Sequence, residues 1–279
     1  MAESEVRATL LVTCVVDVVA PEVGEATVRL LRAAGCEVSC DLAQTCCGRP
    51  AWDAGFPAEA AAVARPTLEA LEAELEAGAE VVVVPAGSCA AMVRQSWPAM
   101  FEAAGERLAA ERARLVGGHT RELSELLAER NGSLPSLQLV RSTRVALHQS
   151  CHLRGEHRVD RQPSDLLDRI GGCQTVEWPS AIACCGFADG LGAEGPERAE
   201  RAKRAERTDG TDGAEPVVVG TEADLLADLD AIEPDLVVGC DTACLVHLRG
   251  RAEAAGRPIE VRHLAEVAAE ALPAGAGWR

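Results

Sequence analysis

The chain has 279 residues, of which 48% are hydrophobic and 12 are cysteines, and its formal net charge is −17. This acidity argues against nucleic acid and anionic membrane surfaces as partners, because both need a basic footprint. No apolar run is long enough to insert into a membrane and the first residues lack the basic charge of a signal peptide, so we expect a cytoplasmic protein. In that compartment, so many cysteines indicate metal binding or redox chemistry rather than disulfides.

The first half of the chain alternates apolar strand patterns with helix patterns. We expect strands at residues 8–14, 37–40 and 80–84, and helices at 21–35, 58–78 and 105–130. Gly35 closes the first of these helices as a C-cap residue, because glycine adopts the left-handed conformation without strain. Pro66 lies inside the second helix and is expected to kink or break it, because its ring removes a backbone hydrogen bond.

The second half repeats the alternation. Strands are expected at residues 144–149, 174–178, 216–220 and 235–239, and helices at 163–172, 196–207 and 222–234. Such alternation indicates βαβ units and therefore an α/β fold, in which helices cover both faces of a parallel sheet. A turn-rich boundary near residues 131–143 separates the halves. We place the first lobe, with its bridging helix, at residues 1–135 and the second lobe at 136–279.

Cysteine landmarks indicate that the chain is an internal duplication. Cys151 lies 137 positions after Cys14, and each of them ends an apolar run. The two Cys-Cys-Gly motifs lie 138 positions apart, and Cys244 follows Cys89 by 155 positions. Landmarks that recur in the same order are typical of a repeat, and the larger last interval indicates an insertion in the second half. We therefore expect two pseudo-symmetric lobes with cysteines at their strand ends.

These cysteines follow the expected strands, whose carboxyl ends meet at one edge of a parallel sheet. The four thiolates expected to converge in each lobe are Cys14, Cys46, Cys47 and Cys89 in the first, and Cys151, Cys184, Cys185 and Cys244 in the second. Four thiolates suit either an iron–sulfur cluster or tetrahedral zinc. Adjacent cysteines reach two irons of a compact cluster more easily than two corners of one zinc site. The doubled cysteine therefore favours one or two iron–sulfur clusters, with zinc possible in one lobe.

Several phrases of the sequence match those of known proteins. They are VTCVVD, PEVGEATVRLL, QTCCGRPAW, PAGSCAAMVR, SCHLRGE and CLVHL with the later HLAEV, and they extend over most of the chain. The duplicated cysteine pattern resembles the CCG domain of the heterodisulfide reductase B subunit, the anaerobic glycerol-3-phosphate dehydrogenase C subunit and the glycolate oxidase iron–sulfur subunit. The phrases as a set resemble the lactate utilization protein A family.

The resemblance implies a role in a three-part cytosolic complex that oxidises L-lactate to pyruvate. In such a complex the companions of this chain would be a ferredoxin-like subunit with cubane 4Fe–4S clusters and a smaller third subunit. This chain would be the electron-transfer component, with its eight matched cysteines as ligands of the clusters. Hydrogen bonds, burial and charge around the sulfur atoms would set the reduction potential.

The sequence departs from its relatives at one position in each half. The heterodisulfide reductase version has five cysteines per half, ending in Cys-x-x-Cys, and the first of these two falls at Ala86 and Asp241 here. We therefore expect four thiolates per lobe, with Cys240, one place from the expected position, as an alternative ligand. We interpret Cys36, Cys40 and Cys173, which lie outside the repeat, as buried structural thiols.

His148 and His152 flank Cys151 in the phrase LHQSCHLRGE. Histidine titrates near neutral pH, so a histidine beside a redox centre can supply protons to a coupled reaction. The alternative is a hydrogen bond to a cluster sulfide or to the backbone. His152 directly adjoins an expected ligand and is therefore the candidate catalytic residue.

Two other functions remain open from the sequence. One is a catalytic subunit that reduces disulfides or quinones, as in other CCG proteins, which would need an open iron site and a nearby proton donor. The other is a non-redox scaffold that binds zinc, which would be colourless and free of labile sulfide.

Overall fold

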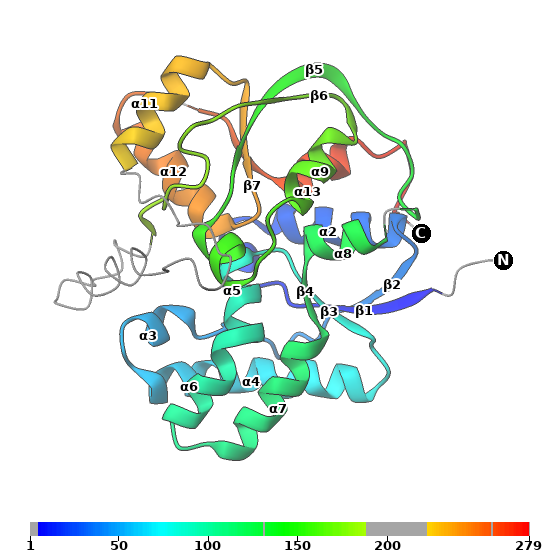
Figure 1. Cartoon of the computed structure of the whole chain (residues 1–279). Coiled ribbons are helices and arrows are strands. Elements are labelled where there is room, and N and C mark those ends of the chain that lie inside the picture. Colours follow the sequence, from blue (N-terminus) through cyan, green and yellow to red (C-terminus); the bar gives the residue numbers. More distant parts are fainter. Residues whose placement is uncertain (1–4, 131, 188–221, 258, 279) are drawn as a thin grey trace, which may run out of the picture.

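We describe a computed structural model of the chain (Figure 1), which covers residues 5–130, 132–187, 222–257 and 259–278. The helix expected at residues 196–207 and the strand expected at 216–220 lie outside the described residues. The described chain forms two lobes, each built around one parallel sheet.

Within the described residues, each sheet has four strands, and all of their pairings are parallel. The first sheet has the order β2-β1-β3-β4, with β1 at Val6–Leu10, β2 at Cys36–Ser39, β3 at Val81–Val84 and β4 at Thr120–Glu122. The second has the order β6-β5-β7-β8, with β5 at Leu137–His148, β6 at Ile170–Val176, β7 at Leu236–Gly239 and β8 at Val261–His263. The identical order confirms the α/β fold with two pseudo-symmetric lobes.

Helices cover both faces of each sheet. The first lobe contains α1 (Cys14–Val19), α2 (Pro21–Ala33), α3 (Arg49–Asp53), α4 (Pro57–Glu76), α5 (Gly87–Ala91), the π-helical turn η1 (Met92–Ser96), α6 (Trp97–Ala103), α7 (Arg107–His119) and α8 (Leu123–Glu129). The second contains the π-helical turn η2 (His152–Glu156), α9 (Gln162–Asp168), α11 (Glu222–Ile232), α12 (Thr242–Ala254) and α13 (Leu264–Glu270).

The two lobes share a hydrophobic core. In Figure 1, α2 and α8 lie between the sheets, and they pack against α13 and α9 of the second lobe. One cluster of buried side chains runs through these four helices and both sheets, whereas α4, α6 and α7 enclose a separate core on the far side of the first sheet. The lobes are therefore held together by continuous apolar packing. This packing fixes the position of the strand ends of one lobe relative to those of the other.

Two short edge strands are findings that the sequence patterns did not predict. The helix expected over 105–130 is interrupted by β4, and β8 occupies a matching place in the second lobe. Each strand has only three residues, too few for a period of two to appear in the sequence. Each ends on the N-cap of the next helix, where Glu122 and Glu125, or His263 and Glu266, form a capping box. The structure thereby identifies one more pair of matching segments in the two lobes, Arg-Glu-Leu-Ser-Glu at residues 121–125 and Arg-His-Leu-Ala-Glu at residues 262–266.

The expected break at Pro66 is wrong, because α4 continues through this residue from Pro57 to Glu76. Proline leaves the carbonyl four residues earlier without its helical donor. That carbonyl belongs to Ala62, which is exposed, so water can take the place of the missing N–H. The cost of a proline is therefore small at this position.

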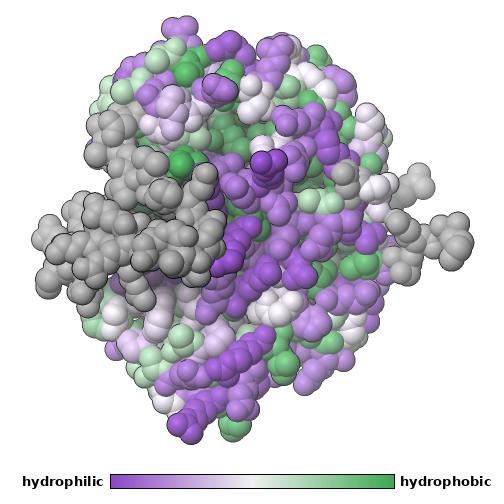
Figure 2. Space-filling model, in the orientation of Figure 1, coloured by the Kyte–Doolittle hydropathy of each residue, from purple (hydrophilic) through white to green (hydrophobic). Residues whose placement is uncertain are grey.

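Hydrophilic side chains dominate the face of the molecule seen in Figure 2, and hydrophobic ones are scattered among them. This agrees with the strongly acidic composition. Among the residues that the structure describes, no helix combines the length and the apolar character that a membrane crossing requires.

Candidate metal centre

The strands of both lobes deliver cysteines to equivalent places. Cys14 is the first residue of α1, which follows β1, and Cys151 directly precedes η2, which follows β5. Cys89 and Cys244 are each the third residue of the helix that follows β3 or β7. The paired cysteines lie in the segments that follow β2 and β6. Segments far apart in sequence therefore meet at the carboxyl edge of each sheet, as the sequence predicts.

Within each lobe, the four sulfur atoms lie close together. In the first lobe the Cys14 thiol donates to the Cys46 sulfur at 3.5 Å, and the Cys47 thiol donates to the Cys89 sulfur at 3.3 Å. The adjacent Cys46 and Cys47 thiols also shift each other's pKa, which links the two pairs.

The second lobe brings the equivalent four thiols together. Cys184 interacts electrostatically with Cys151 and with Cys185, and the Cys185 and Cys244 sulfur atoms lie within 4.8 Å of each other. All of these thiols are free rather than in disulfides. The duplicated sequence therefore folds into two matching sets of four convergent thiols, and these sets are the eight cysteines proposed as ligands.

The same member of each quartet is poised as a thiolate. Interactions with the Cys14 thiol and then with the Cys47 thiol lower the pKa of Cys46 to about 3, and interactions with the Cys151 thiol and then with the Cys185 thiol lower the pKa of Cys184 to about 2. The pKa of Cys14 and of Cys151 shifts in the opposite direction, because the same interactions and burial raise it. Thiolates are the form of cysteine that binds metals.

Both quartets line one cavity of about 80 Å³ between the lobes. The sequence predicts one site per lobe, and the structure adds that the two sites face each other across this space. The other polar residues of the lining are Arg49, Asp53, Ser88, His152 and Asp241, and Phe187 belongs to its apolar part. α1, which begins at Cys14, also packs against α12, which carries Cys244.

The glycine of each Cys-Cys-Gly motif has a left-handed backbone, with φ of 82° at Gly48 and 84° at Gly186. In this conformation the Gly48 amide lies 3.4 Å from the Cys46 sulfur, and the Gly186 amide lies 3.5 Å from the Cys184 sulfur. A Cβ atom at residue 48 would lie 2.6 Å from the carbonyl oxygen of Ala60. Glycine is required here both for the turn and for the close approach of α4.

Two residues that hold the first cysteine pair were not identified from the sequence. The Gln44 side chain accepts a hydrogen bond from the Val12 amide at 3.1 Å and donates to the Leu10 carbonyl at 2.7 Å, which ties the loop to the end of β1. The buried Trp97 indole donates to the Cys47 carbonyl at 2.8 Å. This contact is not visible in the sequence, because the partner is a backbone atom 50 positions away.

His152, the candidate catalytic residue, lines the cavity. Its Nδ1 atom lies 3.7 Å from the Cys151 sulfur, and its Nε2 atom lies 3.8 Å from a carboxylate oxygen of Glu156. Burial, and then the nearby Arg49 guanidinium, lower its pKa, so the imidazole is neutral at pH 7. A neutral imidazole in contact with the Cys151 sulfur agrees better with a hydrogen-bonding role for His152 than with proton donation.

Polar contacts join the two lobes around the cavity. The Arg49 guanidinium makes two hydrogen bonds of 2.7 Å to the Glu156 carboxylate, and a third of 2.9 Å to Asp53. The buried Asp241 carboxylate accepts from the Ser88 amide at 2.6 Å and from the Ala243 amide at 3.2 Å. Asp241 thus links the first turns of α5 and α12, the two helices that carry Cys89 and Cys244.

The remaining cysteines do not join the cavity lining. Cys240 is buried in the shared core, and its carbonyl accepts a hydrogen bond from the Gly87 amide at 3.0 Å. Cys36 is also in that core, Cys173 is half-buried beside it, and Cys40 is exposed. The interpretation of Cys40 as a buried thiol is therefore wrong, because the segment after β2 turns outward there.

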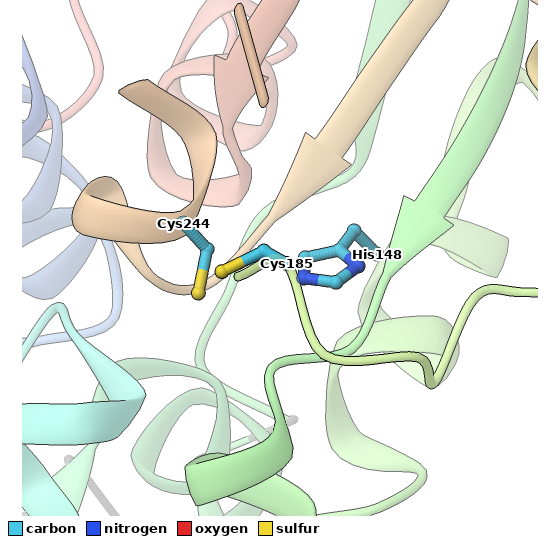
Figure 3. Close-up of side chains that lie close together, drawn as sticks. All are labelled: His148, Cys185 and Cys244. Atoms are coloured by element: carbon cyan, nitrogen blue, oxygen red, sulfur yellow. The ribbon is translucent and has the colours of Figure 1, made fainter. Parts of the chain in front are cut away.

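His148 is not part of the cavity lining but lies beside Cys185 and Cys244, which are. Its ring nitrogen and the sulfur atoms of Cys185 and Cys244 lie within 4.8 Å of one another. Figure 3 shows the three side chains next to each other. Burial lowers the pKa of His148 to about 4, so this imidazole is neutral. The second quartet thus has a nitrogen donor beside it.

Comparison with known proteins agrees with the duplicated site. The model of the CCG cysteine-rich domain matches twice, at residues 8–94 and 145–223, and each match contains one Cys-Cys-Gly motif. The chain belongs to the CCG cysteine-rich family. Within that family it is 32% identical over 259 residues to lactate utilization protein A of Anoxybacillus flavithermus, covering 93% of this chain and 97% of the relative.

Other CCG relatives carry the same name. Lactate utilization protein A of Geobacillus thermodenitrificans is 32% identical over 94% of this chain and 98% of its own, and that of Halalkalibacterium halodurans is 31% identical over 94% and 96%. These matches place the chain in the lactate utilization protein A family. Among solved structures, an aspartate racemase homologue from Pyrococcus horikoshii matches 95% of this chain and 96% of its own at 12% identity, with a TM-score of 0.29, too low to indicate a shared fold.

The donor set of this CCG protein fits a metal centre. Each lobe presents four free thiols on one cavity, and iron–sulfur clusters are held by four cysteine thiolates. Sulfur separations of 3.3 Å and 3.5 Å are also near the ~3.8 Å expected around one tetrahedral zinc ion. The cysteine-rich domain and the adjoining histidine thus indicate metal binding, whichever metal is bound.

Proposed function

We propose that this chain is the iron–sulfur electron-transfer subunit of a complex that oxidises L-lactate to pyruvate. The observation that carries the proposal is the pair of matching thiol quartets facing one cavity, in a chain whose relatives are named lactate utilization protein A. An iron–sulfur centre, when bound, supplies one-electron oxidation and reduction without a bound organic cofactor. The protein supplies the thiolates, the burial and the hydrogen bonds.

The size of the cavity supports electron transfer over conversion of a substrate. Its volume of about 80 Å³ is well below the roughly 300–1,000 Å³ of pockets that bind drug-sized ligands. Eight thiols make up much of its lining, so inorganic centres bound by them would occupy the space. Centres that face each other across so small a cavity would be close enough to exchange electrons.

The chemistry of the reaction requires partners. Oxidation of L-lactate to pyruvate releases two electrons and two protons, and an electron carrier passes the electrons onward. We therefore propose that this chain works with a ferredoxin-like iron–sulfur subunit and a third small subunit. The low pKa of Cys46 and Cys184 keeps both thiolates ready to hold iron at neutral pH.

One observation favours a second function, that of a catalytic CCG subunit that reduces disulfides or quinones. His152 lines the cavity between the quartets, where it would be able to move a proton. Its lowered pKa argues against this role, because a neutral imidazole is a poor proton donor near pH 7. We therefore keep electron transfer as the main proposal.

Growth tests the proposed function. Deletion of the gene that encodes this chain is expected to abolish growth on L-lactate as sole carbon source, with growth on pyruvate unchanged. The wild-type gene should restore growth on lactate, and Cys47→Ser should not, because it removes one thiolate of the first quartet. Cys173→Ser is the matched control and should restore growth, because Cys173 lies outside the cavity. Normal growth of the deletion strain on lactate would overturn the proposal.

A further inference from the structure

The buried imidazole of His148 is the group near the two quartets that the proposed function does not explain. His148 is the last residue of β5, and its side chain is directed toward Cys185 and Cys244 (Figure 3). One ring nitrogen and the two sulfur atoms lie within 4.8 Å of one another, close enough for a single metal ion to contact all three. The Trp178 ring packs beside the imidazole, with centroids 5.9 Å apart.

Both ring nitrogens of His148 are buried without a hydrogen bond of acceptable geometry to the residues that the structure describes. The backbone at Ala181 lies near the imidazole and favours its protonated form, but neither ring nitrogen makes a hydrogen bond to it. A buried polar atom without a partner is destabilising, and proteins rarely keep one without a ligand or a function. Neutral imidazole is also the form of histidine that binds metals.

The equivalent position of the first lobe carries no imidazole. The residue 137 positions before His148 is Leu11, which is 1% exposed, as is His148. Leu11 packs in the same cluster as Cys47 and Cys89, the counterparts of Cys185 and Cys244. At this position the two lobes therefore differ: the first carries an apolar side chain, and the second carries an imidazole.

We propose that His148 is a metal ligand of the second lobe, where it binds the same metal ion as Cys185 and Cys244. The first centre is then held by thiolates alone, and the second by thiolates and one neutral imidazole. This inference rests on the proposed function only in that a metal centre occupies the second lobe.

Nitrogen hyperfine spectroscopy of the full chain, purified without air and poised so that its iron centres are paramagnetic, tests this ligand. Wild type is expected to show strong coupling to a histidine nitrogen that changes when histidine is labelled with ¹⁵N. His148→Leu, which installs the residue of the first lobe, should lose it. His152→Leu is the matched control and should retain it, because His152 adjoins Cys151 rather than the shared metal ion.

Two outcomes would overturn the inference: no histidine coupling in wild type, or coupling that survives His148→Leu. Iron and acid-labile sulfide counts on the same samples separate this failure from that of the proposed function. Protein with iron and sulfide but no coupling from His148 contradicts the ligand alone, whereas protein without any bound metal contradicts both. His148→Cys should keep the iron, lose the coupling and lower the reduction potential, because an anionic thiolate replaces a neutral imidazole.

Thermal unfolding gives an independent readout and shows whether the variant folds. Metal-free His148→Leu should melt at a higher temperature than metal-free wild type, because a buried, unpartnered imidazole is replaced by an apolar side chain of similar size. Metal should raise the melting temperature of wild type more than that of His148→Leu. An equal metal-dependent rise in both proteins would contradict ligation by His148.

Discussion

His263 shows, at the scale of single residues, how burial sets a protonation state away from the metal site. It is the N-cap of α13, where its Nδ1 atom accepts a hydrogen bond from the Ala265 amide at 3.0 Å. Burial lowers its pKa to about 4, although the nearby Asp241 carboxylate opposes the shift. The ordinary histidine pKa of about 6.5 applies in the unfolded chain, so the folded protein binds fewer protons between these values.

This difference predicts a pH dependence of stability. As pH falls from 7 to 5.5, the unfolded state gains a proton at His263 that the folded state does not, so the free energy of unfolding decreases by about 1 kcal/mol from this residue. His263→Asn keeps a capping acceptor and does not titrate. Urea unfolding at matched metal content should therefore show a smaller loss for the variant than for wild type. Equal losses in the two proteins would show that the His263 imidazole does not resist protonation in the fold.

Residue identity predicts some of these roles and not others. The eight thiols were predictable because cysteine is chemically distinctive and the duplication marks which ones correspond. The roles of Gln44, Trp97 and His263 were not, because each acts through a backbone atom that only the fold brings near. His148 was visible beside Cys151, but its approach to Cys185 and Cys244 depends on the pairing of β5 with its neighbours.

The Cys-Cys-Gly turn is the local element on which each quartet depends. It places two thiols next to a left-handed glycine, and in the first lobe it packs against α4. The turn was predictable as a cysteine-bearing loop with glycine beside the site. Its contact with the Ala60 carbonyl was not, because that residue belongs to a different element.

Gly48→Ala should therefore destabilise the protein by about 3 kcal/mol, from left-handed strain plus a clash with backbone that cannot move away easily. Gly105→Ala is the matched control. Gly105 has the same φ of +82°, but no atom lies within 4 Å of its added Cβ. It should cost about 1 kcal/mol from strain alone. Denaturant unfolding compares the two variants, and equal losses would contradict the close packing of the turn.

The elements that the sequence mispredicted failed for local reasons. β4 and β8 are too short for the alternation of apolar and polar residues to appear in the sequence. They form because each pairs with the free edge of a neighbouring strand, β3 or β7. The proline in α4 did not break the helix, because the freed carbonyl lies on an exposed side. Patterns along the chain report local preference, whereas these outcomes depend on burial and on the neighbouring strand.

At the scale of the whole molecule, duplication explains the arrangement of the site. Two copies of one α/β unit pack through α2, α8, α9 and α13, which directs the cysteine edge of each sheet toward the same cavity. The sequence predicted the two lobes and the members of each quartet. It could not predict that the quartets face each other, because that depends on how the lobes dock and on contacts such as the Arg49–Glu156 pair.

Both quartets are proposed to bind an iron–sulfur centre, and metal analysis tests this most directly. Wild type, Cys47→Ser, Cys185→Ser and the control Cys173→Ser should be purified without air, and their iron, zinc and acid-labile sulfide counted per chain. Brown wild-type protein with iron and sulfide is expected, with about half the iron lost in each variant of the cavity and none lost in Cys173→Ser. Colourless wild-type protein without sulfide, or an iron count unchanged by either cavity substitution, would contradict the account.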